Sequence, residues 1–343
     1  MTSAQLVDVR GLREARARTL HDFVASSGLQ PLVLGTSKDP NAKVTILLVD
    51  ATRRAPVLAV KAPTTEAAER AVQHELSVLA DVHARVPGEL ALTIPRVVDT
   101  VSFEGRVTAV ATALQGRPMT TVYLAGRHTS RRREVASDFA AVATWLERFQ
   151  RATAGALGPL EMDCGVSDAL RRRFGGDVLE RDLERLAETY DRLRRNSVRR
   201  TVVHGDFWLG NALIDRGRVS GVVDWEAAAM SGEPTRDLVR FAHMYALYLD
   251  RRTRPGKRVA GHPGLCANEW GAGVRYALDG DGWFPYLFRE FVGNGLARLG
   301  ASRLSWRDAA VAGIAEVAAF TDDDEFARRH LELFRRVAGS GQR

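Results

Sequence analysis

The hydrophobic pattern of this chain changes its period near residue 115. Before that point, short β-rich apolar runs are separated by turn residues, which predicts strands. After residue 134, apolar residues recur at helical spacing, interrupted by a strand pair around residues 200–224. Since 343 residues also exceed what one compact core usually supports, the pattern predicts two lobes of different secondary structure.

The first lobe reads as a small antiparallel sheet with one helix. Residues 30–61 are predicted to form a meander of three short strands, and a helix follows over residues 66–82. Two more strands are predicted over residues 95–103 and 106–114. A separate helix is expected over residues 11–27, where Gly28 ends the helical pattern.

These elements predict an α+β protein of three parts. We divide the chain into an N-terminal helical extension (1–28), an N-lobe (29–115) and a larger, mainly helical C-lobe (116–343). The boundary of the two lobes falls at the Gln-Gly-Arg-Pro segment that begins at Gln115, because glycine and proline interrupt both periods there.

Composition excludes several classes of protein. The chain is 45% hydrophobic, which is too high for a disordered protein. Its longest apolar runs, residues 44–49 and 107–114, are too short to cross a bilayer, and no apolar signal segment begins the chain. The two cysteines form no Cys-x-x-Cys pair, which fits a reducing compartment. We therefore expect a cytoplasmic protein with no membrane partner.

The charge balance requires a separate explanation. A formal net charge of +7 can indicate a nucleic-acid partner. The arginines are scattered among acidic residues, however, and no nucleic-acid-binding motif is present, so we expect no nucleic-acid partner. Only four of the 49 basic residues are lysines, so each lysine is a candidate for a specific task; they are Lys38, Lys43, Lys61 and Lys257.

Residues 201–226 carry the most informative pattern. A short apolar strand leads to Asp206, Asn211 follows five residues later, and a second strand ends in Asp224. Phosphoryl transfer uses a carboxylate that accepts the proton of the attacking hydroxyl, together with oxygen ligands that hold Mg²⁺ against phosphates. The spacing predicts Asp206 as the catalytic base and Asn211 and Asp224 as metal ligands. The turn preference of Asp and Asn alone does not explain this arrangement.

These motifs resemble those of the aminoglycoside phosphotransferase and choline kinase family, and the resemblance covers residues 30 to about 250. The segments that carry it are His204-Gly-Asp206-x-x-x-x-Asn211, Asp224-Trp225-Glu226 and Asp237-Leu238. The resemblance implies a bilobal, protein-kinase-like fold, ATP as donor, Mg²⁺ as cofactor and a small-molecule hydroxyl as acceptor. One departure is Gln150, which stands where the family usually has His.

The resemblance also implies a nucleotide site in the N-lobe. Lys61, at the end of the third strand, would contact the α- and β-phosphates. Glu75 on the following helix would pair with this lysine, and Glu69 is the competing candidate. Backbone groups of Thr112 and Leu114 would bind adenine.

A phosphate-binding loop is expected between the first two strands. Its candidate residues are Gly35, Thr36 and Ser37, which would offer backbone or hydroxyl donors to phosphate. An ordinary hairpin turn is the alternative interpretation of this segment.

The C-lobe would determine which acceptor is used. A polycationic aminoglycoside needs an acidic pocket, for which the sequence offers Glu269, Asp279, Asp281 and Glu290. The basic segment at residues 251–258 is either a solvated loop or a docking site for an anionic acceptor.

We therefore predict an ATP-dependent phosphotransferase that acts on a hydroxyl of an aminoglycoside, sugar or similar small molecule. One alternative is a metabolic kinase of an amino alcohol or sugar with no role in resistance. A catalytically inactive kinase-fold protein and a nucleic-acid-binding protein are the alternatives from other functional classes.

Overall fold

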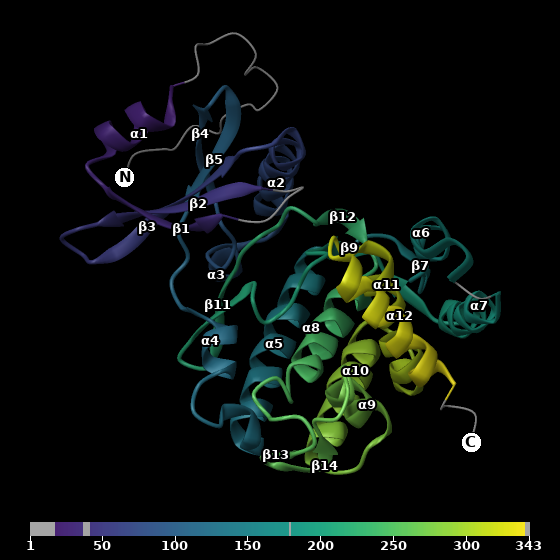
Figure 1. Ribbon diagram of the computed structural model, residues 1–343. Coiled ribbons are helices and arrows are strands. Elements are labelled where there is room, and N and C mark those ends of the chain that lie inside the picture. The colour runs from purple at the N-terminus through teal and green to yellow at the C-terminus, as the bar shows by residue number, and fades with distance from the viewer. Residues whose placement is uncertain (1–17, 37–41, 178–179, 340–343) are drawn as a thin grey trace. The chain divides into compact units, whose positions relative to one another are not determined.

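The computed structural model describes residues 18–36, 42–177 and 180–339, which form two compact units. Unit 1 extends to Gln115 and also includes Gly221–Ala228. Unit 2 comprises Gly116–Ser220 and the chain from Ala229 onward. Unit 1 contains an antiparallel sheet and unit 2 is mainly helical, which confirms the predicted α+β class (Figure 1).

Unit 1 is built on a five-stranded antiparallel sheet with the strand order β1-β2-β3-β5-β4. All five strands were expected from the sequence within a few residues. Their bounds are β1 (Gln30–Thr36), β2 (Lys43–Asp50), β3 (Ala55–Pro63), β4 (Val97–Phe103) and β5 (Arg106–Thr112).

Helices cover both faces of this sheet: α1 (Leu20–Ser27) lies on one and α2 (Glu66–Arg85) on the other, followed by the short α3 (Gly88–Ala91). Phe23 of α1 shares a buried cluster with Val110, whereas Val72 of α2 packs against Ala109. Neighbouring residues of β5 therefore face opposite helices, as the strand period requires. Lys61 lies opposite Ala109 in the β3–β5 register, which directs its side chain toward α2. Of the helix predicted over residues 11–27, residues 11–17 lie outside the described chain.

Unit 2 is held together by buried aromatic side chains on several helices. Phe139 on α5 (Arg132–Ala152) makes edge-to-face contacts with Phe241, Tyr245 and Phe291. None of the described helices is long and apolar enough to cross a membrane. The helices are α4 (Met119–Tyr123), α5 (Arg132–Ala152), α6 (Val166–Phe174), α7 (Glu180–Arg194), α8 (Thr235–Leu247), α9 (Ala272–Asp279), α10 (Trp283–Arg298), α11 (Trp306–Phe320) and α12 (Asp324–Ala338).

The chain after Gln115 also contains more strands than the sequence predicted. The expected strand pair around residues 200–224 corresponds to β9 (Thr201–Val203), β10 (Ala212–Asp215) and β11 (Arg218–Val222). The expectation of a single pair was wrong, because the additional strands span only two to five residues, too few to show a period. They are β6 (Arg117–Pro118), β7 (Leu157–Pro159), β8 (Ser197–Arg199), β12 (Ala229–Gly232), β13 (Arg258–Val259) and β14 (His262–Cys266).

Candidate active site

In unit 1, Lys61 lies between two carboxylates. Its Nζ donates to Oε1 and Oε2 of Glu75 at 2.6 and 2.7 Å and to Oδ1 of Asp224 at 2.8 Å. Burial alone would lower the pKa of Lys61, but the charges of Glu75 and Asp224 outweigh it and raise that pKa above its ordinary value. The lysine is therefore held as a fixed cation.

Glu75 links this lysine to the 221–228 segment. Its side chain is buried, and its Oε1 also accepts the backbone N–H of Trp225 at 3.1 Å. Trp225 is fully buried and anchors the segment through its indole N–H, which donates to the carbonyl of Val222 at 2.8 Å. Glu69, the competing candidate, instead accepts the backbone N–H of Val107 at 2.9 Å.

A second lysine, Lys43, reaches the same segment from β2. It forms an ion pair with Glu226, and its Nζ lies 3.6 Å from Oδ1 of Asp224. In the β2–β3 register Lys61 lies opposite Thr45, two residues from Lys43, so both lysines leave the same face of adjacent strands. Lys43 stands out in the sequence as a rare lysine, but no place in the site was predicted for it.

Asp224 adopts an unusual backbone conformation. Its φ of 70° lies in the left-handed region, which non-glycine residues rarely occupy. Such a conformation persists where surrounding contacts hold it, and here the two lysines hold the carboxylate. The strain thus coincides with the carboxylate that the sequence predicts as a metal ligand.

In unit 2, the catalytic segment that the sequence predicts, residues 204–211, follows β9 and is braced by α8. The backbone N–H groups of His204 and Gly205 donate to Oδ2 and Oδ1 of Asp237 at 2.7 and 2.9 Å. Asp237 lies in the first turn of α8 and is buried, and this burial raises the pKa of its carboxyl group. Asp237 therefore lies at the start of a helix and also supports the segment before Asp206.

The carboxylate of Asp206 is held from two sides. The Nδ2 of Asn211 donates to the Asp206 carbonyl at 2.9 Å and to Oδ2 at 3.2 Å. Arg240 donates to Oδ1 from Nη2 at 2.7 Å and from Nε at 3.2 Å. The sequence reasoning missed Arg240, although it lies one helical turn after Asp237 and thus on the same side of α8.

The two predicted metal ligands belong to different units, Asn211 to unit 2 and Asp224 to unit 1. Because Nδ2 of Asn211 faces Asp206, its amide oxygen is directed away from that carboxylate. Amide and carboxylate oxygens form a donor set that suits a hard cation such as Mg²⁺.

Comparison with protein families matches residues 43–272 to the phosphotransferase enzyme family. The chain belongs to this family. The matched range begins at Lys43 and contains Lys61, Asp206, Asn211 and Asp224. The protein is thus a small-molecule phosphotransferase. Among curated proteins, none matches the chain.

Solved structures show which fold this phosphotransferase shares. A thermostable mutant of aminoglycoside phosphotransferase APH(4)-Ia in its apo form is 14% identical, has a TM-score of 0.56 and aligns over 93% of this chain and 98% of that one. A ternary complex of such a mutant with ADP and hygromycin B is 15% identical, with a TM-score of 0.54 and coverage of 94% and 99%. Macrolide 2'-phosphotransferase type I is 16% identical, with a TM-score of 0.50 and coverage of 93% and 99%. At these identities the likeness concerns the protein-kinase-like fold.

The remaining nucleotide candidates that the structure describes lie in strands or just beyond one. Gly35 and Thr36 lie within β1, paired with β2, and Ser37 lies outside the described residues. The N–H of Thr112 donates to the carbonyl of Arg96 at 2.9 Å, so this donor is already used within the sheet. Leu114 lies just beyond the end of β5.

Proposed function

We propose that this phosphotransferase transfers the γ-phosphate of ATP to a hydroxyl group of a small molecule. The observation that carries the proposal is the ion pair of the partly buried Lys61 with Glu75, because kinases use a lysine paired with a helix glutamate to hold nucleotide phosphates. A structural neighbour, the APH(4)-Ia mutant, was solved with ADP, which supports a nucleotide donor.

Unit 1 would supply the nucleotide site. Lys61 would contact the α- and β-phosphates, and Glu75 would keep its ammonium group aimed at them. Lys43 would hold Glu226 and Asp224 in place. We further propose that backbone groups around Leu114 bind adenine, and that residues 29–115 form the nucleotide-binding lobe and residues 116–343 the acceptor-binding lobe.

Unit 2 would supply the acid–base chemistry. Asp206 would orient the acceptor hydroxyl and take its proton as the new oxygen–phosphorus bond forms and the bond to the leaving ADP breaks. Its side chain is 34% exposed, so an acceptor can reach it. Asn211 in unit 2 and Asp224 in unit 1 would each offer an oxygen ligand to Mg²⁺, which neutralises phosphate charge when bound.

The test is a coupled ADP-release assay on the wild type and on Asp206→Asn. We expect the substitution to lower turnover at least about a hundredfold, because it removes the proton acceptor. Thermal stabilisation by ATP with Mg²⁺ should persist, since Asp206 is not part of the proposed nucleotide site. Wild-type turnover in Asp206→Asn would refute the proposed base. A salt-sensitive thermal shift with DNA, and none with ATP, would favour the nucleic-acid alternative.

A further inference from the structure

Aromatic and basic side chains of unit 2 gather near Asp206. Trp208 follows two residues later, and its ring centroid lies 6.3 Å from that of Tyr248 at the end of α8. The guanidinium carbon of Arg251 lies 5.0 Å from the centroid of the Tyr248 ring. Neither aromatic ring is fully buried, so both can contact a ligand.

The charges that act on Tyr248 connect this group to the catalytic carboxylate. Burial raises the pKa of Tyr248, the cations of Arg251 and Arg240 lower it, and the carboxylate of Asp206 raises it. The phenol is therefore within electrostatic range of two guanidinium groups and one carboxylate. The carboxylate of Asp206 is already paired with Arg240. Within this set of two guanidinium groups and one carboxylate, the positive charge of Arg251 is therefore in excess.

Asp250 is the acidic residue closest in sequence to this group. It is half-buried, and burial raises the pKa of its carboxyl group. The Asp250 carboxyl group is therefore less readily ionised than an exposed one.

Three of the four acidic residues expected to line a pocket for a polycation, all but Asp281, are bound to arginines instead. Glu269 pairs with Arg275 and Arg336, whereas Asp279 pairs with Arg307 and Glu290 with Arg303. The aromatic residues of the same region also pack internally: Trp270 contacts Phe326 and His330, and Trp283 contacts His262. A polycation would have to displace these arginines from their carboxylates.

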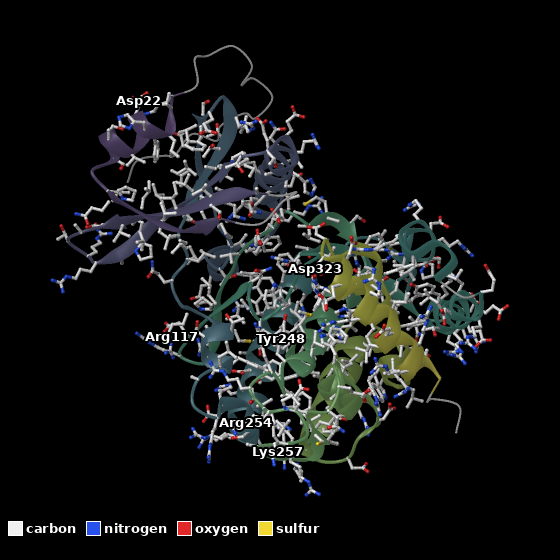
Figure 2. The ribbon with its side chains drawn as sticks, in the orientation of Figure 1. Asp22, Arg117, Tyr248, Arg254, Lys257 and Asp323 are labelled. Carbon is white, nitrogen blue, oxygen red and sulfur yellow. The ribbon has the colours of Figure 1, made fainter. Side chains whose placement is uncertain are left out.

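We propose that the acceptor is a hydroxylated small molecule that carries a negatively charged group, which Arg251 binds while Trp208 and Tyr248 contact the carbon framework. This inference rests on the proposed kinase activity and specifies its substrate class. Arg254 and Lys257 lie farther along the same loop, toward β13 and β14, and are exposed (Figure 2). Neither side chain is part of the proposed site.

The experiment measures ADP release with acceptors matched in framework and different in charge. One set is glucuronate, glucose and glucosamine, a second is glycerate, glycerol and serinol, and hygromycin B serves as the polycation. We expect the anionic member of a set to have a kcat/KM at least about tenfold above that of its cationic member. Arg251→Glu should lower the ratio of anionic to neutral kcat/KM by about tenfold or more.

Arg254→Glu is the matched control, since it makes the same charge change on the same loop and should leave that ratio within about twofold. Preference for a cationic compound, no use of any anionic compound, or an unchanged ratio in Arg251→Glu would each overturn the inference. Slow hydrolysis of ATP by water that depends on Asp206 tests the kinase activity separately from the acceptor. If the wild type releases ADP neither with water nor with any of these acceptors, the proposed function itself fails.

Discussion

The guanidinium of Arg240 donates from Nη2 and Nε to one carboxylate oxygen of Asp206, Oδ1, at 2.7 and 3.2 Å. The other oxygen, Oδ2, accepts from Asn211. Donors on both oxygens fix the rotation of the carboxylate before any acceptor arrives. Preorganisation of this kind contributes to turnover more than to folding.

Arg240→Gln is therefore expected to lower kcat by about 10- to 100-fold. Arg240→Lys should recover part of this loss, since an ammonium group keeps the charge but cannot donate from two sites in a plane. Arg236→Gln is the control on the same helix. Arg236 forms an ion pair with Glu316 at 2.6 Å and none with Asp206, so its loss should lower the free energy of unfolding by about 1–3 kcal/mol with little change in kcat. Full turnover in Arg240→Gln would contradict the positioning role.

Lys43 and Glu226 should behave as a coupled pair. Lys43→Met removes the cation paired with Glu226, and Glu226→Gln removes one of the carboxylates beside the buried Lys43. Each change should therefore lower the free energy of unfolding by about 1–3 kcal/mol. The double variant should cost less than the sum of the two single variants. Urea unfolding of all four proteins measures the coupling, and strict additivity would show that the pair contributes nothing. If a variant of Lys43 or Glu226 needs a higher Mg²⁺ concentration than the wild type for half-maximal turnover, the substitution has also moved Asp224.

Asp237→Asn should damage the catalytic segment. Asp237 accepts the N–H groups of His204 and Gly205 on its two oxygens, and an asparagine would turn its NH₂ group toward one of these donors. We expect a loss of about 1–3 kcal/mol in the free energy of unfolding and a lower kcat. Thermal unfolding and steady-state rates measured on the same sample test both effects; wild-type values in both would show that these two bonds are dispensable.

The buried pair of His243 and His330 should make stability depend on pH. The two Nε2 atoms lie 2.9 Å apart, and Nδ1 of His330 lies 2.7 Å from the carbonyl of Phe326. Nδ1 of His330 must therefore carry a proton, and its Nε2 accepts from His243. Burial lowers the pKa of both side chains, that of His330 to about 3.

The direction of the pH effect follows from these lowered pKa values. Below about pH 6.5 the two histidines bind protons in the unfolded chain but stay neutral in the folded protein. The free energy of unfolding therefore decreases as the pH is lowered from about 6.5 to about 3. Each histidine contributes at most about 1.4 kcal/mol per pH unit. His330→Gln should flatten the dependence between pH 6.5 and 4 in urea titrations, whereas His21→Gln on the exposed side of α1 should not. Equal slopes for wild type and His330→Gln would disprove the assignment.

The elements that could be predicted from the sequence are those with a regular spacing of apolar residues along the chain. The strands around Lys61 and the long helix that bears Glu75 were predictable because their apolar residues keep one period over many residues. Strands of two or three residues, such as β7 and β8, show no period and depend on tertiary pairing. Arg240 was missed because one arginine among 49 basic residues carries no signal, whereas the rarity of lysine could have identified Lys43 as readily as Lys61.

The assignment of Gly221–Ala228 to unit 1 has a consequence for dissecting the protein. The chain passes from one unit to the other three times, so no single cut separates them. A truncated chain that ends at Gln115 would lack Asp224, Trp225 and Glu226, and with them the carboxylates that bind Lys61 and Lys43. Lys43 would then lose the carboxylates of Glu226 and Asp224, and Lys61 would keep that of Glu75 alone, so the first 115 residues are not expected to fold as an autonomous unit. Isolating that unit would require grafting residues 221–228 back onto it through a designed linker.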